Sequence, residues 1–286
     1  MNQSKVSICI PTFKQINYLR KTLDSIVIQD YEDFEIIVTD DTPDNSVKQF
    51  IDTYDFKGKL SYYKNAVALG SPENWNECIR KASGKYIKTM HHDDWFFEPA
   101  SLRKFVDALE NEPNAGFAFS LVNSYNEKLN KYNRHEVTQE FISNLRLDPA
   151  LLFFSNLIGP PSATIFKKDL ELSFDRNLKW VVDIDFYIHY LLKNKFVFIN
   201  EVLISSVNNA AHSVTNDCIN KEVEIFEYTY LYKKIYKGSL SKKYIEFFKN
   251  LFIRYDVNKK ELKTLIKGLR LDTNIHLALI KKNIGI

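Results

Sequence analysis

Apolar and polar residues alternate in a regular way over the first 120 residues of this 286-residue chain. Short apolar runs predict five strands. They lie at 5–10, 34–39, 60–64, 86–90 and 116–122. The segments between these runs carry apolar residues every three or four positions, which predicts helices, as with Leu19, Leu23 and Ile26. Strands that alternate with helices are typical of a mostly parallel sheet with helices on both faces, so the expected fold class is α/β.

The pattern becomes less regular after residue 123. Residues 123–135 are polar and predict a flexible connection. Weaker signals predict a strand at 162–166, a helix at 183–192, and strands at 196–200 and 202–207. From residue 221 onward the chain has the spacing of amphipathic helices. We therefore expect an α/β domain at 1–220 and a basic helical extension at 221–286.

The charge of the chain is distributed unevenly. The whole chain carries +3, but residues 231–286 hold 14 basic and 4 acidic residues, a net charge of +10 that leaves −7 for the rest. A basic segment on an acidic body predicts an anionic partner, either lipid headgroups or nucleic acid. Nucleic acid is the weaker of these two interpretations, because the lysines belong to no recognisable binding module. A solvated, lysine-rich helix face explains the same charge without a partner.

Apolar residues recur among these lysines at helical spacing. Such a pattern suits helices that lie in a membrane interface, and it equally suits helices that pack on the α/β domain or form a dimer contact. The apolar positions are Leu231, Ile235, Leu240, Phe247, Phe248, Leu251, Phe252, Leu262, Leu265, Ile266 and Leu269.

The cysteines and the lack of long apolar runs predict the compartment. Cys9, Cys78 and Cys218 are far apart and form no C-x-x-C pair, which favours a reducing compartment and argues against a structural zinc site. A strand-like run begins at residue 5, and no apolar run approaches the roughly 20 residues that span a bilayer. We expect a cytoplasmic protein, with peripheral attachment to the inner face of the membrane as an extension of that prediction.

Pairs of acidic residues follow two of the predicted strands. Asp40 and Asp41 follow the second strand, and Asp93 and Asp94 follow the fourth. Ligands of parallel sheets bind at the carboxyl ends of the strands, where these pairs lie. Adjacent carboxylates repel each other unless a cation meets them, and Mg²⁺ or Mn²⁺ would also bind a diphosphate. Each pair alone is weak evidence for a metal, because aspartate is common as a helix cap in the loop between a strand and a helix.

Four segments taken together are more specific. They are VSICIPTF, IVTDDTPDNS, LGSPENWN and SGKYIKTMHHDDWFFEP, in this order. Their order and spacing resemble those of inverting family 2 glycosyltransferases, strongly over residues 5–110 and loosely over 155–215. The resemblance implies the GT-A fold, a nucleotide-sugar donor, and a Mn²⁺ or Mg²⁺ cofactor.

The resemblance also implies roles for individual residues. The expected donor-binding residues are Pro11, Thr12, Phe13, Asp41, Asn74 and Asp93. Phe13 would stack on the base, Asp41 would accept a hydrogen bond from a uracil imide, and Asp93 would hold the ribose. Asp94 would bind the metal, while His92 replaces the first acid of the family's usual Asp-x-Asp motif. His212 is expected to be a metal ligand or a phosphate donor.

An inverting transfer also needs a general base for the acceptor hydroxyl. In family members this carboxylate lies at the start of a helix, and the matching stretch here is Lys179-Trp180-Val181-Val182-Asp183-Ile184-Asp185. Asp183 is the candidate base and Asp185 is the second choice. Val182 replaces the family's usual glutamate, so a non-catalytic nucleotide-sugar-binding protein of the same fold stays open.

Other nucleotide-dependent enzymes fit the sequence less well. A sugar nucleotidyltransferase would carry a glycine-rich loop after the first strand, but IPTFKQINYL contains no glycine. The chain also lacks the glycine motifs of dinucleotide oxidoreductases and P-loop enzymes. The resemblance to family 2 glycosyltransferases implies transfer of a sugar from a nucleotide-sugar, expected to be a UDP-sugar, to a hydroxyl of a glycan or lipid-linked acceptor. It also implies bacterial surface polysaccharide synthesis as the context.

Overall fold

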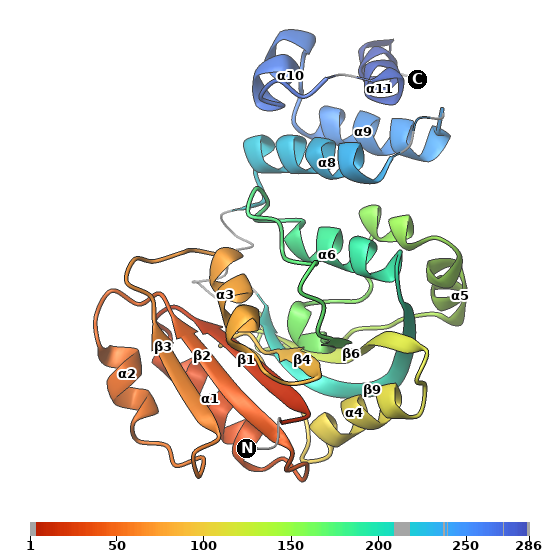
Figure 1. The fold of residues 1–286 in the computed structure, drawn as a ribbon. Coiled ribbons are helices and arrows are strands. Elements are labelled where there is room, and N and C mark those ends of the chain that lie inside the picture. The colour runs from red at the N-terminus through yellow and green to blue at the C-terminus, as the bar shows by residue number, and fades with distance from the viewer. Residues whose placement is uncertain (1–3, 209–217, 237, 239, 271, 285–286) are drawn as a thin grey trace.

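One curved, nine-stranded sheet forms the centre of the computed structural model, which describes residues 4–208, 218–236, 238, 240–270 and 272–284 (Figure 1). The strands are β1 (Val6–Thr12), β2 (Phe34–Asp40), β3 (Leu60–Lys64), β4 (Tyr86–Thr89), β5 (Trp95–Phe96), β6 (Ala115–Asn126), β7 (Lys131–Arg134), β8 (Thr164–Lys167) and β9 (Lys195–Asn208). Their order across the sheet is β3-β2-β1-β4-β8-β6-β9-β5, and β7 pairs with β6.

The sheet is parallel in its first half and mixed in its second. Strands β3, β2, β1 and β4 all run in the same direction. Strand β8 is antiparallel to both β4 and β6, whereas β6 and β9 are parallel. The expectation of a mostly parallel sheet therefore holds for the first four strands. All seven residues of β1 are buried, as is typical of a parallel strand covered on both faces.

Helices cover both faces of the sheet. In the α/β part they are α1 (Ile16–Val27), α2 (Ser46–Ile51), α3 (Glu73–Lys81), α4 (Ser101–Glu110), α5 (Gln139–Leu147) and α6 (Val182–Leu191), with short 3₁₀ turns η1 (Pro149–Phe153) and η2 (Pro161–Ala163). The C-terminal helices are α8 (Lys221–Ile235), α9 (Lys242–Arg254), α10 (Lys259–Leu265) and α11 (Thr273–Ile284). Core residues of α1, α2 and α4 share one apolar cluster, and those of α3, α5, α6 and the C-terminal helices share the other.

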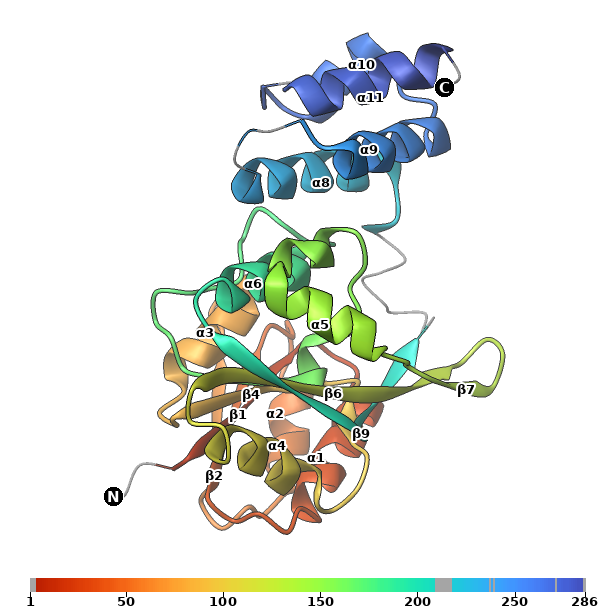
Figure 2. The same ribbon diagram turned by 90° about the vertical axis from the view of Figure 1, so that its right-hand side faces the viewer.

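Residues 123–135 form a hairpin and not the expected flexible connection. Strand β6 continues to Asn126 and turns back into β7, and the hairpin projects beyond the rest of the sheet (Figure 2). All four residues of β7 are exposed, so the strand can be polar on both faces, and its sequence resembles that of a loop. The two strands expected at 196–200 and 202–207 are one continuous strand, β9.

The apolar residues of the C-terminal helices pack inside the protein. Leu231, Leu251, Phe252, Leu262, Ile266 and Phe248 are buried, and Ile235, Phe247, Leu265 and Leu269 pack partly buried against the same cluster. Leu240 alone of the eleven is exposed. Packing of the C-terminal helices on one another and on the α/β part accounts for this spacing, and α8 is the helix that lies beside α6 (Figure 1). Within the described residues, no helix has the length and apolar character needed to cross a membrane.

Phe248 should make a large contribution to stability. Its ring lies 5.3 Å from that of Tyr232 and 6.1 Å from that of Phe153, between centroids, and its side chain is fully buried. We expect Phe248→Ala to lower the free energy of unfolding by about 3–5 kcal/mol. Ile253→Ala is the matched control on the same helix, because Ile253 is 53% exposed and its loss should change stability by about 0.5 kcal/mol or less.

Tryptophan fluorescence during urea unfolding measures this effect. All three tryptophans, Trp75, Trp95 and Trp180, lie outside residues 221–286. Trp75 and Trp95 report the α/β part, whereas Trp180 also borders α8, where its N–H donates to Glu227. If the two variants unfold at the same urea concentration by this signal, the C-terminal helices do not share the stability of the sheet. That result would contradict the joint packing described above.

Candidate active site

The carboxyl ends of β1, β2 and β4 bring the two acidic pairs to one edge of the sheet. Thr12 at the end of β1 pairs with Asp40 at the end of β2, and Cys9 pairs with Thr89 at the end of β4. Asp41 therefore follows β2 at the same edge at which residues 91–94 follow β4. This is the edge where a parallel sheet exposes its loops to a ligand.

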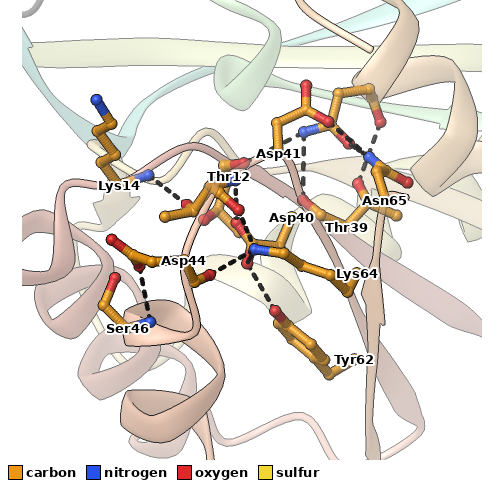
Figure 3. Close-up of polar contacts among 12 residues, drawn as sticks. Thr12, Lys14, Thr39, Asp40, Asp41, Asp44, Ser46, Tyr62, Lys64 and Asn65 are labelled. Atoms are coloured by element: carbon orange, nitrogen blue, oxygen red, sulfur yellow. Dashed lines mark hydrogen bonds and ion pairs between the residues drawn. The ribbon is translucent and has the colours of Figure 1, made fainter. Parts of the chain in front are cut away.

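Asp40 holds the loop after β2 in place. It is fully buried, and its carboxylate accepts hydrogen bonds from the Tyr62 hydroxyl at 2.6 Å and the Thr42 N–H at 2.7 Å. The Lys64 ammonium forms an ion pair with it at 3.1 Å and also donates to the Asp44 carbonyl at 2.6 Å (Figure 3). Asp40 therefore ties the loop after β2 to β3, which is a structural role.

Asp41 is oriented by three donors from one loop. Its carboxylate accepts from the Asn65 side chain at 2.8 Å, from the Leu69 N–H at 2.9 Å and from the Gly70 N–H at 2.8 Å. Gly70 has a φ of +73°, a conformation that favours glycine, and this conformation directs its N–H to the carboxylate. A carboxylate can accept about four hydrogen bonds, so one acceptor position stays available for an imide N–H.

The other expected donor-binding residues of this region differ in exposure. Pro11 and Thr12 are buried, whereas Phe13 is 46% exposed beside them and offers a ring face for stacking. Asn74 is buried, and its amide donates to the carbonyls of Thr12 at 3.3 Å and Thr39 at 3.2 Å. Asn74 thus ties α3 to the ends of β1 and β2. A direct contact of Asn74 with the donor stays a prediction.

Three side chains after β4 form a candidate metal site. Ligand atoms of His91, Asp93 and Asp94 all lie within 4.8 Å of one another. Burial, and next the charge of Asp93, raise the pKa of the Asp94 carboxyl well above its usual value, while a hydrogen bond from Ser162 and the charge of Lys88 oppose this shift. A divalent cation would offset the repulsion between the two carboxylates.

His91 supplies a neutral nitrogen to this group. Burial lowers the pKa of His91 to about 4, so the imidazole is uncharged at pH 7. Its Nε2 atom is buried, and no hydrogen-bond partner for that atom exists among the described residues. The ring lies against Trp75, with centroids 4.5 Å apart. A neutral imidazole with a buried, unpaired nitrogen has the chemistry of a metal ligand.

The turn around Ser162 joins the metal site to the second half of the sheet. The Ser162 hydroxyl accepts a hydrogen bond from the His91 N–H at 2.9 Å. The fully buried Lys88 ammonium donates to the Ser162 carbonyl and, at 3.0 Å, to the Thr89 carbonyl. Burial lowers the pKa of Lys88 to about 7. Lys88 therefore fixes the turn next to the candidate metal ligands.

Asp183 lies in the first turn of α6, on the side of the metal site. Its carboxylate accepts hydrogen bonds from the Asn156 side chain at 2.8 Å and the Ile184 N–H at 2.8 Å. Burial raises the pKa of Asp183 to about 6. The pKa of the Tyr187 phenol is raised by burial and then by the charges of Asp183 and Asp94, so both carboxylates lie near this ring. A carboxyl group with a pKa near 6 suits a general base at neutral pH.

Asp185 faces a different part of the protein. Its carboxylate forms ion pairs with the Lys234 ammonium at 2.7 Å and with His189 Nδ1 at 3.3 Å. It lines a cavity of about 680 Å³, together with Arg80 and Asp175, whose walls include neither Asp183 nor the three candidate metal ligands. Asp185 thus faces this cavity, whereas Asp183 and Asp94 both lie near the Tyr187 phenol. His212 lies outside the described residues.

Residues 7–172 match the family model described as glycosyl transferase family 2. The chain belongs to this family. An uncharacterized glycosyltransferase of Rickettsia typhi is 28% identical over 248 residues, which cover 83% of this chain and 72% of the relative. An uncharacterized glycosyltransferase of Methanocaldococcus jannaschii is 29% identical over 217 residues, or 71% of each chain.

Solved glycosyltransferase structures share the fold. Residues 1–349 of Staphylococcus aureus TarS with UDP-GlcNAc align with a TM-score of 0.61 and 16% identity, over 92% of this chain and 70% of TarS 1–349. The mannosyltransferase PcManGT of Pyrobaculum calidifontis, with GDP-Man and Mn²⁺, aligns with a TM-score of 0.59 and 16% identity, over 99% of this chain and 74% of the mannosyltransferase. The GT-A fold and the membership of family 2 glycosyltransferases, which use nucleotide-sugar donors, are thereby confirmed.

Sequence reasoning missed His91 and Asn156. His91 directly precedes the segment that corresponds to the Asp-x-Asp motif of family 2. His92, and not His91, occupies the position of the first acid in that motif. Asn156 is 27 residues from Asp183 and belongs to no motif. Histidine beside an acidic pair is a usable signal for a metal ligand, whereas nothing in the sequence indicates the contact of Asn156.

Proposed function

We propose that this chain transfers a sugar from a UDP-sugar to a hydroxyl of a glycan or lipid-linked acceptor, with inversion at the anomeric carbon. The strongest support comes from two carboxylates, those of Asp94 and Asp183, which lie near the same side chain. Asp94 lies in the candidate metal site, Asp183 has a pKa near 6, and the charges of both reach the Tyr187 phenol. A donor site and an acceptor-side base at one edge are what an inverting transfer requires.

We assign Asp183 as the general base. The acceptor hydroxyl would form the new C–O bond to the anomeric carbon while the bond from that carbon to the diphosphate oxygen breaks. Asp183 would take the proton of the hydroxyl, and the nucleoside diphosphate would leave. Because the pKa of Asp183 is raised to about 6, the carboxylate form predominates at pH 7, and turnover should fall as the pH drops through about 6.

The metal would be held by Asp94 with His91 and Asp93. When bound, it offsets charge that develops on the leaving diphosphate. Two carboxylates suit either Mg²⁺ or Mn²⁺, and the imidazole nitrogen favours Mn²⁺, because Mg²⁺ takes almost only oxygen ligands. Asp93 lies within this group of ligand atoms, so the ribose contact that the family resemblance implies for Asp93 has to be tested beside metal binding.

The acceptor is a glycan or a lipid-linked hydroxyl in this proposal, and bacterial surface polysaccharide synthesis is the proposed context. Support comes from a Campylobacter jejuni relative, a GalNAc(5)-diNAcBac-PP-undecaprenol beta-1,3-glucosyltransferase. This enzyme is 29% identical over 126 residues, which cover 43% of this chain and 39% of the relative. Its name describes a sugar acceptor on a lipid diphosphate.

UDP should bind more tightly than any other nucleoside diphosphate, with dTDP second. The free acceptor position of Asp41 suits the imide N–H of uracil or thymine, whereas cytosine has no N–H there. Asp41→Asn would place an amide N–H against the imide or against one of the three loop donors, so UDP affinity should fall about 10-fold or more. Calorimetry with UDP, dTDP, CDP and GDP measures this. Tighter binding of GDP, as in the donor bound to the Pyrobaculum mannosyltransferase, would contradict the UDP assignment.

A further inference from the structure

Helix α8 contacts the segment that leads into the candidate base. The buried Glu227 carboxylate, 3% exposed, accepts three backbone hydrogen bonds from this segment. One oxygen accepts from the Lys179 N–H at 2.8 Å. The other oxygen accepts from the N–H groups of Trp180 at 2.8 Å and Val181 at 3.1 Å. Asp183 follows two residues later.

Glu227 serves this segment as a cap from a distant part of the chain. The first N–H groups of a helix have no partner within the helix, and a nearby side chain usually accepts from them. The N-cap residue of α6, Val181, has no side chain that can do so. Glu227, 46 residues further along the chain, accepts from the N–H groups that lead into the helix. Without it the buried Val181 N–H would be unpaired.

We infer that Glu227 is a positioning residue of the transfer reaction, which fixes the segment 179–181 and thereby the direction of the Asp183 carboxylate. The inference rests on the proposed function, in which Asp183 is the base. Through this role of Glu227, the C-terminal helices belong to the catalytic unit. A second contact from the same helix supports it, because Lys234 forms ion pairs with Asp185 on α6 at 2.7 Å and with Asp175 at 2.8 Å.

The charge of Glu227 also acts on Asp183. Besides burial, which is the largest cause, the negative charge of Glu227 raises the pKa of Asp183. Among the described residues, Tyr187 on α6 and Tyr228 on α8 also face Asp183. Both are neutral phenols at pH 7, because their pKa values are raised. Removing the charge of Glu227 should therefore lower the pKa of Asp183 and make it a weaker base.

Glu227→Gln tests the inference in the full chain. Glutamine keeps the shape and one carbonyl oxygen but loses the charge and one acceptor. We expect kcat to fall about 10- to 100-fold, as for a small displacement of a catalytic group. The acid limb of the pH profile should move down by roughly half a pH unit. UDP affinity should stay unchanged, because the donor pocket around Asp41 lies on other elements.

Two further variants complete the test. Glu224→Gln is the matched control: Glu224 lies one turn earlier on α8, is 4% exposed, and pairs with Arg254 at 3.0 Å instead of the 179–181 segment. It should leave the acid limb in place. Glu227→Asp keeps the charge with a shorter reach, so kcat should fall while the acid limb stays near its wild-type position. If Glu227→Gln does not fold, the kcat of Glu227→Asp decides the question.

Asp183→Asn distinguishes a failure of the positioning role of Glu227 from a failure of the proposed base. If Asp183→Asn is inactive while the Glu227 variants keep wild-type kcat and the wild-type acid limb, Glu227 has no positioning role and the proposed base stands. If Asp183→Asn is fully active, the proposed base is wrong whatever the Glu227 variants do. An equal shift of the acid limb in Glu224→Gln and Glu227→Gln would also overturn the inference.

Discussion

Asp94→Ala is expected to reduce sugar transfer by about 1,000-fold, because a bound divalent cation contributes several kcal/mol to stabilising charge on a leaving diphosphate. Asp94 is the most buried of the three candidate ligands, and burial raises the pKa of its carboxyl. Some carboxyl groups have a higher pKa in the folded protein than in the unfolded protein. Such a group lowers the free energy of unfolding as the pH rises through the pKa of the unfolded state. Loss of Asp94 should therefore not lower stability at pH 7, although it lowers activity.

Asp94→Asn and His91→Gln sharpen this prediction. The asparagine variant keeps the shape, so its thermal midpoint in the absence of metal should equal or exceed that of the wild type. Calorimetric titration with Mn²⁺ in the presence of UDP should show no binding to Asp94→Asn and weakened binding to His91→Gln. Chelation should remove the activity of the wild type, and Mn²⁺ should restore it. Undiminished transfer by Asp94→Ala in the presence of a chelator would contradict the metal site.

Asp183→Asn is expected to lower kcat about 100-fold or more, the effect typical of losing a general base. The amide oxygen can still accept the hydrogen bond from Asn156, and only the bond from the Ile184 N–H is lost. UDP affinity should be unchanged, because the base acts on the acceptor. The acid limb near pH 6 should disappear from the remaining activity, since that limb reports the protonation of Asp183.

Asp185→Asn is the matched control for this variant. Asp185 lies on the same helix, but its carboxylate is paired with Lys234 and faces the separate cavity. We expect Asp185→Asn to lower the free energy of unfolding, to change kcat little, and to leave the acid limb of the pH profile in place. The opposite pattern, an inactive Asp185→Asn and an active Asp183→Asn, would show that the wrong carboxylate has been assigned.

The parts of the fold that the sequence predicted are those with local causes. A parallel strand buried on both faces is a continuous apolar run, as in β1, and parallel strand ends necessarily meet at one edge. Asp41 and Asp94 could be placed at that edge for this reason. The hairpin of β6 and β7 escaped prediction because the exposed strand β7 has no apolar face to reveal it.

The parts that escaped prediction depend on contacts between distant segments. Asn156 meets Asp183 across 27 residues, and Glu227 meets Val181 across 46, with no local pattern at either end. The C-terminal helices illustrate the same limit in another way. An amphipathic period is identical whether the apolar face meets a membrane or a protein core, so only the position of the helices decides that Phe248 is buried in the core.

Slow hydrolysis of nucleotide sugars tests the central claim most directly. The purified chain would be incubated with Mn²⁺ and a panel of nucleotide sugars, and NMR would follow the released sugar before its anomers equilibrate. We expect release of UDP together with a sugar of inverted anomeric configuration, and we expect Asp94→Ala and Asp183→Asn both to suppress this release. Release with retained configuration, or release that neither variant diminishes, would contradict it.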